Sequence, residues 1–398
     1  MKKTLLSGTL VCLLSASAAA LPKYEPLPED LRLLSKKGMD AIYAVDIEEA
    51  KKDFNLALQK YPDHPFPHFG LAMAEWANLE YLEEESDPGL ARKYSVLTDK
   101  AIAVGRKWIA AHPGDANAYL CLGGIYGLRA RLDVLQHHWI KAYFAGRKAL
   151  SNTRMSLKID PGLYDAYLGL GLYEYYAGTL PGVVKLLASI MMRGDAAKGI
   201  EYLKLCRDKG YFNARAAALL LIEIYTRHGS PYANPELAVK LSKELLATAP
   251  EQPQLQFVEI VSLYEDKKYE ESRKEMLNYL AAVYALKPGF RKSFLPRVLT
   301  AIGDTYLAEK DYDKAAKYFS KAAATLKEDP DRHPARWAVW AMVELGNVYD
   351  LKRMRPEALE LYRQARSYRD EWGFSESIGR YLKKPFTEDE LPLPIPPP

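Results

Sequence analysis

The chain has 398 residues, a formal net charge of +4 and nearly equal numbers of basic and acidic side chains, 55 and 51. Charges of both signs are mixed along its length, which excludes the concentrated basic surface of a nucleic-acid-binding protein. Three cysteines in a chain of this length exclude a fold that depends on several disulfides.

Residues 1–20 have the features of a secretory signal peptide. Lys2 and Lys3 precede an apolar stretch, Leu5 to Leu14, and a run of small residues ends at Ala20. The apolar stretch is shorter than the roughly 20 residues of a membrane-spanning helix, and the small residues suit signal-peptidase cleavage. We therefore expect export by the Sec route, cleavage after Ala20, and a location in the periplasm or cell envelope. Cys12 lies inside the apolar stretch, so we do not expect lipidation.

A repeated helix pair runs through the mature chain. Its clearest copies are Leu299 to Ala322 and Met342 to Ala365, in which a glycine is followed twelve residues later by a small–large–small pattern. The small residues let two antiparallel helices pack closely, and the large residue fills the groove between them. The same pattern ends with a proline in Ala50 to Pro62, where the missing amide ends the helix. We predict an all-α solenoid of about eight such pairs over residues 21–383, held as one domain by packing between neighbours.

Repeats three and four are longer than the others. The separation between the first-helix glycine and the second-helix small residue is 26 from Gly123 to Ala149 and 28 from Gly171 to Gly199, against twelve in the regular repeats. The additional residues of repeat three are predicted to lengthen its helices. Both repeats are therefore expected to carry helical insertions.

The insertion of repeat four contains an apolar decamer, Val183 to Met192, after a break at Thr179–Pro181. Ten residues are too few to span a bilayer, and we expect no transmembrane span in the mature chain. We predict a short helix that fills or covers the groove of the solenoid and buries Leu186, Leu187 and Ile190. Peripheral association with a membrane stays open.

The segment IDPGLYDAYLGLGLYEYYAGTLPGVVKLL, followed by GDAAKGIEYL, resembles the signature of a group of exported bacterial tetratricopeptide repeat proteins. That group is distantly similar to the eukaryotic inclusion-body-clearance and outer-membrane tetratricopeptide family. The resemblance is strongest from Gly123 to Ala233 and gives way to generic repeats on either side. It implies a helical solenoid with a binding or scaffolding role, and it transfers no catalytic residue.

Motifs for catalysis, cofactors or metals are not found. The strings GxxxxGK[ST], GxSxG and HExxH do not occur, and the glycines of GLGLYE lie inside a predicted helix, where they serve packing rather than phosphate binding. His64 and His68 are flanked by prolines, and the adjacent His137 and His138 would point about 100° apart on a helix. We expect surface or capping histidines, no metal site, no cofactor and no enzymatic activity. Cys121 and Cys206 are expected to be buried and unbridged.

Aromatic and charged residues gather around the two insertions. Glu174 takes the position that Tyr306 and Tyr349 hold in other repeats, and a buried carboxylate there needs a partner, for which Arg129 and Arg131 are the candidates. Tyrosine offers a large rigid surface with a hydroxyl, although repeat helices also pack tyrosines in their cores. The candidate partner- or ligand-facing residues are Tyr126, Arg129, Arg131, Trp139, Tyr173, Glu174 and Tyr176.

Two features concern the groove and the end of the chain. The residue after the repeat glycine is expected to face the concave groove, as for Asp304 and Asn347, and successive first helices lack the Lys, Arg and Asn set that clamps a peptide carboxylate. The Pro-rich residues 384–398 form neither a helix nor a central strand, and we expect a disordered tail there.

These observations favour a non-enzymatic exported scaffold or adaptor that binds a protein or peptide partner in the concave groove, in the cell envelope. The partner is not a nucleic acid. The alternative is a small-molecule or lipid-binding accessory protein, for example to a transporter, with a pocket formed by the insertions of repeats three and four.

Overall fold

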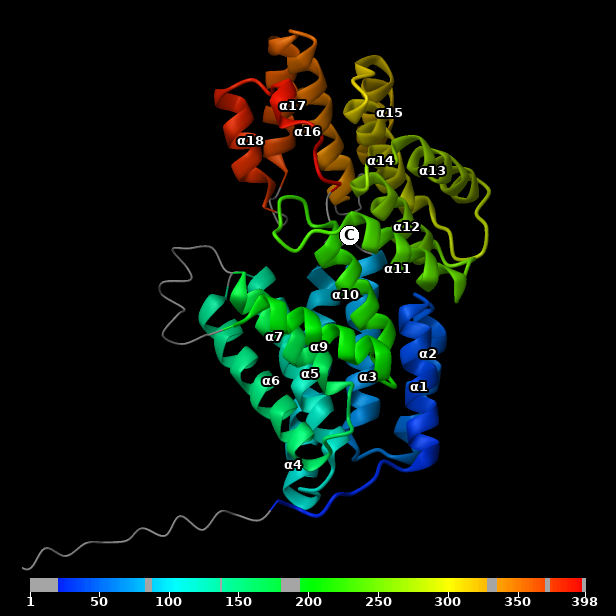
Figure 1. Cartoon of the computed structure of the whole chain (residues 1–398), viewed down its shortest axis with the longest axis vertical. Helices are drawn as coiled ribbons and strands as arrows, with labels where there is room; N and C mark the ends of the chain where they lie inside the picture. The colour runs from blue at the N-terminus through cyan, green and yellow to red at the C-terminus, as the bar shows by residue number, and fades with distance from the viewer. Residues whose placement is uncertain are drawn as a thin grey trace, which may run out of the picture.

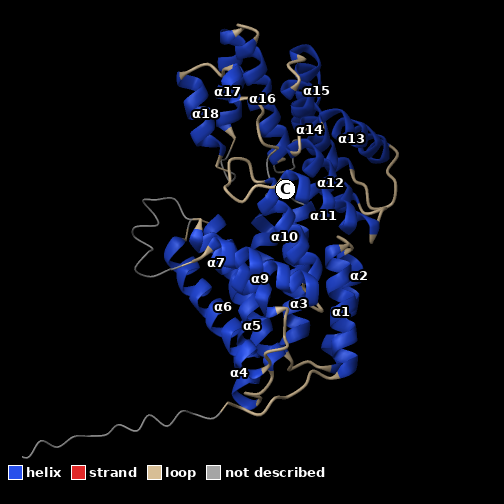
Figure 2. Ribbon diagram, viewed as in Figure 1, coloured by secondary structure: helices blue, strands red, loops and turns tan. Residues whose placement is uncertain are grey.

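The computed structural model describes residues 21–82, 88–136, 138–179, 194–327, 335–368 and 373–395. The predicted signal peptide and the Val183–Met192 decamer lie outside these residues. Throughout the described ranges the regular structure is helical, and Figure 2 shows no strand among them. None of the helices there combines the length and the apolar character that crossing a membrane requires.

The described helices form eight antiparallel pairs, followed by one more helix, which confirms the predicted solenoid (Figure 1). In chain order the elements are α1 (Glu29–Tyr43) with α2 (Ile47–Lys60), α3 (Pro65–Ala77) with α4 (Pro88–Ala111), α5 (Ala116–Leu135) with α6 (Trp139–Ile159), α7 (Ala166–Gly178) with α9 (Ala196–Lys209), α10 (Ala214–Thr226) with α11 (Pro235–Ala247), α12 (Pro253–Glu265) with α13 (Tyr269–Tyr284), α14 (Leu295–Ala308) with α15 (Tyr312–Ala324), α16 (Arg336–Leu351) with α17 (Arg355–Ser367), and finally α18 (Phe374–Lys383).

Local sequence explains where these helices start. Side chains of Asp or Asn accept a hydrogen bond from the third backbone amide of the helix that they precede, which satisfies one of its unpaired donors. The N-caps of this kind are Asp46, Asp115, Asp195, Asn234 and Asp311. Four of these five caps begin the second helix of a pair, so the turn inside the repeat is specified by the sequence.

Glycines let neighbouring helices approach closely, both within a repeat and between successive repeats. A Cβ atom on Gly70 would lie 2.1 Å from the ring of Phe54, and one on Gly38 would lie 2.6 Å from the same ring. In the C-terminal repeats the ring of Phe319 packs against Gly303, and the ring of Tyr362 packs against Gly346. Because no real Cβ contact is this short, the small–large pairing seen in the sequence is a steric requirement of the packing.

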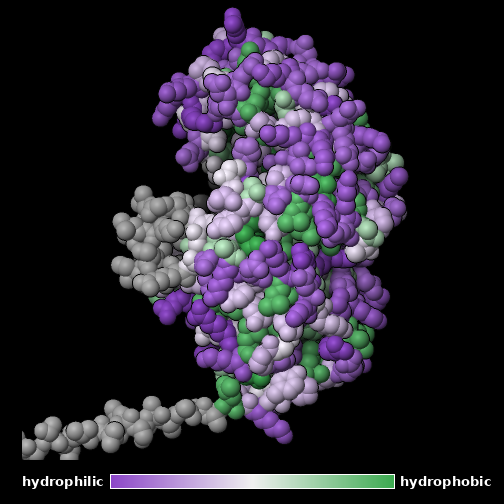
Figure 3. All heavy atoms as spheres, in the orientation of Figure 1, coloured by the Kyte–Doolittle hydropathy of each residue, from purple (hydrophilic) through white to green (hydrophobic). Residues whose placement is uncertain are grey.

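The first helices of successive repeats line one side of the solenoid, which we call the inner face. Contacts join α1 to α3, α3 to α5, α5 to α7, α10 to α12, and α14 to α16. The molecule is elongated, with the N-terminal repeats at one end and α14–α18 at the other (Figure 1). The long α5 and α6 account for the insertion predicted in repeat three. On the face shown in Figure 3, hydrophilic residues predominate and apolar residues form separate patches, as expected of a protein surface in water.

The prediction of a disordered tail from residue 384 is wrong for residues 384–395. Phe386 is only 2% exposed and Ile395 only 4%, and the Phe386 amide donates a hydrogen bond to Asp350 at 2.9 Å. The backbone forms no helix or strand except for a single 3-10 turn, Glu388–Glu390. The Pro-rich composition correctly excludes helices and strands in this segment. The extended chain is nevertheless held in place by its apolar side chains and by backbone carbonyls that are free to accept hydrogen bonds.

Candidate functional site on the inner face

The arginines proposed as partners of Glu174 contact the preceding repeat instead. Arg129 pairs with Asp99 at 2.6 Å, and Arg131 pairs with Glu80 while its guanidinium lies 5.2 Å from the ring centre of Trp76. Glu174 lies at the end of α7, next to the start of α9, and its carboxylate accepts the Asp195 amide at 3.0 Å. The predicted ion pair is therefore wrong, because both arginines point back towards the second repeat.

The aromatic candidates do not form one surface. Tyr126 is buried beneath Lys148, whose ammonium lies 5.4 Å from its ring centre, whereas Trp139 is 61% exposed at the start of α6. Tyr176 donates a hydrogen bond to Glu223 at 3.3 Å, and burial with the charge of Glu223 raises the pKa of this tyrosine to about 12. The predicted set is spread over separate environments, with Tyr173 placed at a hollow beside α6.

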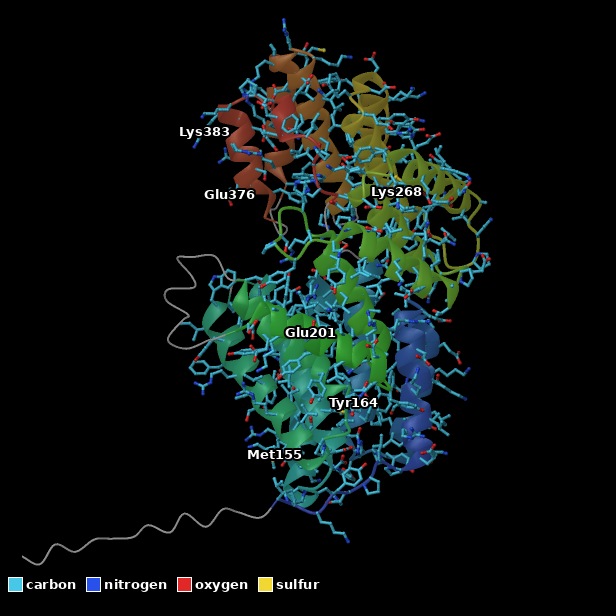
Figure 4. The ribbon with its side chains drawn as sticks, viewed as in Figure 1. Met155, Tyr164, Glu201, Lys268, Glu376 and Lys383 are labelled. Carbon is cyan, nitrogen blue, oxygen red and sulfur yellow. The ribbon has the colours of Figure 1, made fainter. Side chains whose placement is uncertain are left out.

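This hollow has a volume of about 890 Å³ and lies between α6 and residues of α5 and α7. Tyrosines contribute apolar surface, and three cations, Arg147, Arg154 and Lys158, stand around it without an acidic residue among its described lining. Met155, labelled in Figure 4, lies on the same helix and also lines the hollow. Such a mixture suits an anionic ligand with an apolar part. Apart from Tyr173, none of these lining residues was selected from the sequence.

The histidines and cysteines have structural roles. His64 caps α3, accepting the Phe66 amide, and its other ring nitrogen lies 3.0 Å from Asp115, so the capping role is confirmed although the side chain is buried. His68 is hydrogen-bonded to the carbonyl of Pro62. Cys121 and Cys206 are both buried free thiols. No cluster of three potential metal ligands occurs in the part of the chain that the structure describes.

The N-terminal part of the inner face is closed by an internal loop, Tyr211–Asn213, between α9 and α10. Phe212 packs against Phe66 of α3 with ring centres 4.9 Å apart, and Asn213 accepts the hydroxyl of Tyr43 from α1. All three loop amides donate to the carboxylate of Asp165, at 2.7 to 3.0 Å. The first turn of the solenoid is thus joined to its middle through this loop.

The C-terminal part of the inner face is covered by residues 391–395, which we call the terminal strap. In Figure 1 the red C-terminal segment passes α16 and runs towards the middle of the molecule. The hydroxyl of Tyr264 on α12 donates to the Leu393 carbonyl at 2.6 Å, and the Ile395 backbone donates to Glu265. Leu391 and Leu393 pack on buried clusters that contain residues of α14 and α16. The strap therefore crosses three successive first helices.

Carboxyl groups lie under this part of the inner face. Asp304 of α14 and Glu344 of α16 are fully buried, and Asp304 Oδ2 and Glu344 Oε1 have no hydrogen-bond partner among the described residues. Burial, followed by the neighbouring Glu344, raises the pKa of Asp304 well above its usual value, and burial raises the pKa of Glu344 to about 8. Burial also raises the pKa of Glu265 to about 7. Like charges so close favour the protonated forms at neutral pH.

Residues 298–333 match the family model described as the tetratricopeptide repeat. This segment is a tetratricopeptide repeat. It comprises α14, α15 and the residues that follow, and α14 is one of the three first helices beneath the strap. The match thus falls on one of the repeats of regular spacing rather than on the lengthened repeats three and four.

Solved structures of other helical-repeat proteins are similar to the chain. One is the Rap protein complexed with competence and sporulation factor, at 12% identity and a TM-score of 0.48, covering 89% of this chain and 80% of that one. Another is NprR in complex with its cognate peptide NprX, at 15% identity and a TM-score of 0.42, covering 91% and 96%. A third is yeast Tom70, at 12% identity and a TM-score of 0.39, covering 90% of each chain. No curated protein matches the sequence.

Little in the local sequence indicates the C-terminal site. Asp304 and Asn347 were placed on the groove side by their position after the repeat glycine, yet both are buried in the complete molecule. The signal for the strap was the alternation of apolar residues with proline in LPLPI, a pattern that favours an extended backbone with exposed carbonyls.

Proposed function

We propose that this protein is a non-enzymatic scaffold, exported to the cell envelope, whose inner face binds an extended peptide segment of a partner protein. One observation carries the proposal: residues 391–395 lie extended across α12, α14 and α16, with backbone hydrogen bonds to Tyr264 and Glu265. Backbone contacts of this kind accept any sequence with the right apolar side chains, which is how peptide-binding grooves combine affinity with selectivity.

The composition of the C-terminal inner face supports a peptide rather than a reaction. Its polar groups include the Tyr264 hydroxyl, three carboxyls and the buried Asn347 amide, and apolar residues of the repeat core surround them. No nucleophile paired with a base has been identified among them. Distributed contacts along a row of helices suit recognition of a chain several residues long.

The peptide-binding test uses the mature chain ending at Glu390, which lacks the terminal strap, and a fluorescently labelled peptide with the sequence of residues 391–398. Fluorescence anisotropy should show saturable binding. Tyr264→Phe, which removes the hydroxyl donor, should weaken binding about fivefold, corresponding to ~1 kcal/mol for one neutral hydrogen bond. Tyr284→Phe is the matched control, because Tyr284 on α13 is 64% exposed. Equal, unsaturable signals with all three proteins would reject the groove as a peptide site.

The export part of the proposal is supported by the charged, apolar and small-residue regions of residues 1–20. Fusing residues 1–30 to alkaline phosphatase, which becomes active only after export, should give an active enzyme in a bacterial host. Replacing Leu5 and Leu6 with arginine should abolish that activity. An inactive fusion with the intact sequence would contradict export by this route.

The hollow beside α6 favours a second candidate function, the binding of an anionic amphiphile. Its three cations would hold an acidic head group, and its tyrosines and Met155 would contact the apolar part. Native mass spectrometry of the gently purified protein should then show a retained ligand. The mass shift should disappear in Arg147→Glu with Arg154→Glu, and a clean apoprotein from several preparations would count against this function.

A further inference from the structure

We propose that the terminal strap is an intramolecular competitor for the peptide groove, which opens when an extended, proline-interrupted apolar segment of a partner takes the strap's place. The inference rests on the proposed function and adds its regulation and the chemistry of the partner. The strap lies outside the helices and follows a segment after α18 that has only one 3-10 turn, so its release requires no rearrangement of the helices.

The strap is held by two hydrogen bonds and by the packing of its three apolar side chains. Among the described residues, the Tyr264 hydroxyl reaches the Leu393 carbonyl, the Ile395 amide reaches Glu265, and Ile395 is buried with the core cluster that includes Tyr264 and Ile260. Pro392 and Pro394 have no amide to donate, and Pro394 is exposed. An equivalent segment from another protein can make the same contacts, so the strap and a partner would exclude each other.

The residues just before the strap are held by different groups. Glu388 accepts Lys310 at 2.5 Å and Tyr312 at 2.7 Å, and Glu390 pairs with Arg380 at 2.7 Å. Phe386 is buried against Tyr381, with ring centres 5.6 Å apart. The chain is therefore fixed up to Glu390, and the strap is tethered beside its own site. A short tether gives an effective concentration in the millimolar range, enough to suppress a weak external competitor.

The groove also restricts the chemistry of the partner. The strap brings no charge to a surface whose floor contains Glu265, Asp304 and Glu344. An acidic residue in the partner segment would meet three carboxyl groups in a low-dielectric environment, which is unfavourable. The partner segment that fits is extended and apolar, has prolines at alternate positions, and is free of acidic residues.

The test compares the full mature chain, the chain ending at Glu390, and full-length Ile395→Asp, using the labelled peptide of residues 391–398 as the probe. The full chain should bind the peptide at least tenfold more weakly than the truncated chain, and Ile395→Asp should bind within twofold of the truncated chain. A peptide with aspartate at the position of Leu393 should fail to bind any of the three. Circular dichroism confirms that the variants are folded.

Equal affinity of the full and truncated chains would overturn the strap as a competitor while leaving the groove as a peptide site. Absence of binding to the truncated chain would reject the proposed function itself, and this inference with it. Inhibition that grows with protein concentration, together with a dimer in light scattering, would assign the strap to a second copy and overturn the intramolecular arrangement.

Discussion

The inner face is closed at both ends of the molecule, but by segments of different kinds. At the N-terminal end the closing segment is the loop Tyr211–Asn213, continuous with α9 and α10, and three of its amides bind the buried carboxylate of Asp165. At the C-terminal end the closing segment is the strap, which contains no regular secondary structure and follows α18 through a segment with a single 3-10 turn. The first closure is part of the fold, whereas the second can be released without unfolding a repeat.

The largest expected effect is at Asp165. Asp165→Ala leaves two buried amides and one half-buried amide without an acceptor and should lower the free energy of unfolding by about 3–5 kcal/mol, at 1–3 kcal/mol for each unsatisfied group with partial relaxation. Urea denaturation followed by circular dichroism measures it. Asp208→Ala, at an exposed position on α9, is the control. A loss below about 1 kcal/mol would mean that the loop is held by its aromatic packing instead.

Removing the terminal strap should have a smaller effect. Truncation after Glu390 exposes the site of one buried isoleucine and two half-buried leucines, and we expect a loss of about 1–3 kcal/mol in the free energy of unfolding. The same urea experiment checks it, with the far-ultraviolet helical signal unchanged before the transition. If truncation cost more than Asp165→Ala, the strap would be a structural element like the loop, and the contrast between the two closures would fail.

The buried carboxyls of the C-terminal inner face predict a dependence of stability on pH. The folded pKa of Glu344 is about 8 and that of Glu265 about 7, both above the value of 4.5 for an unperturbed glutamate. Between the unfolded and the folded pKa of each group, the folded state therefore binds more protons than the unfolded state. The resulting stabilisation of the fold is complete below the unfolded pKa and is lost as the pH rises through the folded pKa.

Between pH 5 and pH 8 the free energy of unfolding should fall, because the folded state gives up the protons of both groups over this range. Glu344→Gln should flatten the profile, since the amide needs no proton to stay neutral. Thermal melts at half-unit pH intervals measure the change, with Glu270→Gln on the exposed side of α13 as control. A profile that rises from pH 5 to pH 8 would contradict protonated carboxyls beneath the strap.

The smallest effect is expected at the arginines selected from the sequence. Arg131→Ala breaks a pair with Glu80 in which the arginine side chain is half-exposed, and exposed pairs contribute about 0–1 kcal/mol. Peptide binding should not change, because α5 is remote from the strap (Figure 1). A loss of peptide binding in this variant would place the site in repeat three instead.

Sequence reasoning predicted the fold well because the repeat is a local steric pattern. The glycine–phenylalanine pairing of Gly303 with Phe319, and its recurrence every few dozen residues, is visible without any knowledge of the tertiary structure. The lengthened helices of repeat three followed from the same spacing. The pairing of neighbours in a solenoid then determines most of the architecture.

The site was harder to predict because it joins residues that are far apart in the chain. Tyr264 and Leu393 are separated by 129 positions, and nothing in either local sequence indicates the contact. The density of aromatic and charged residues near Glu174 pointed to repeats three and four, but local density does not reveal whether a side chain points inward, outward or towards the preceding repeat. Arg129 and Arg131 illustrate the last case.

Hydrogen exchange locates the peptide site most directly. The chain ending at Glu390 is compared with and without a saturating amount of the peptide of residues 391–398, and the exchange of each helix is followed by mass spectrometry. The account predicts slower exchange in α12, α14 and α16 and no change in α5, α6 and α7. Protection confined to α5–α7, with none in the C-terminal first helices, would contradict it.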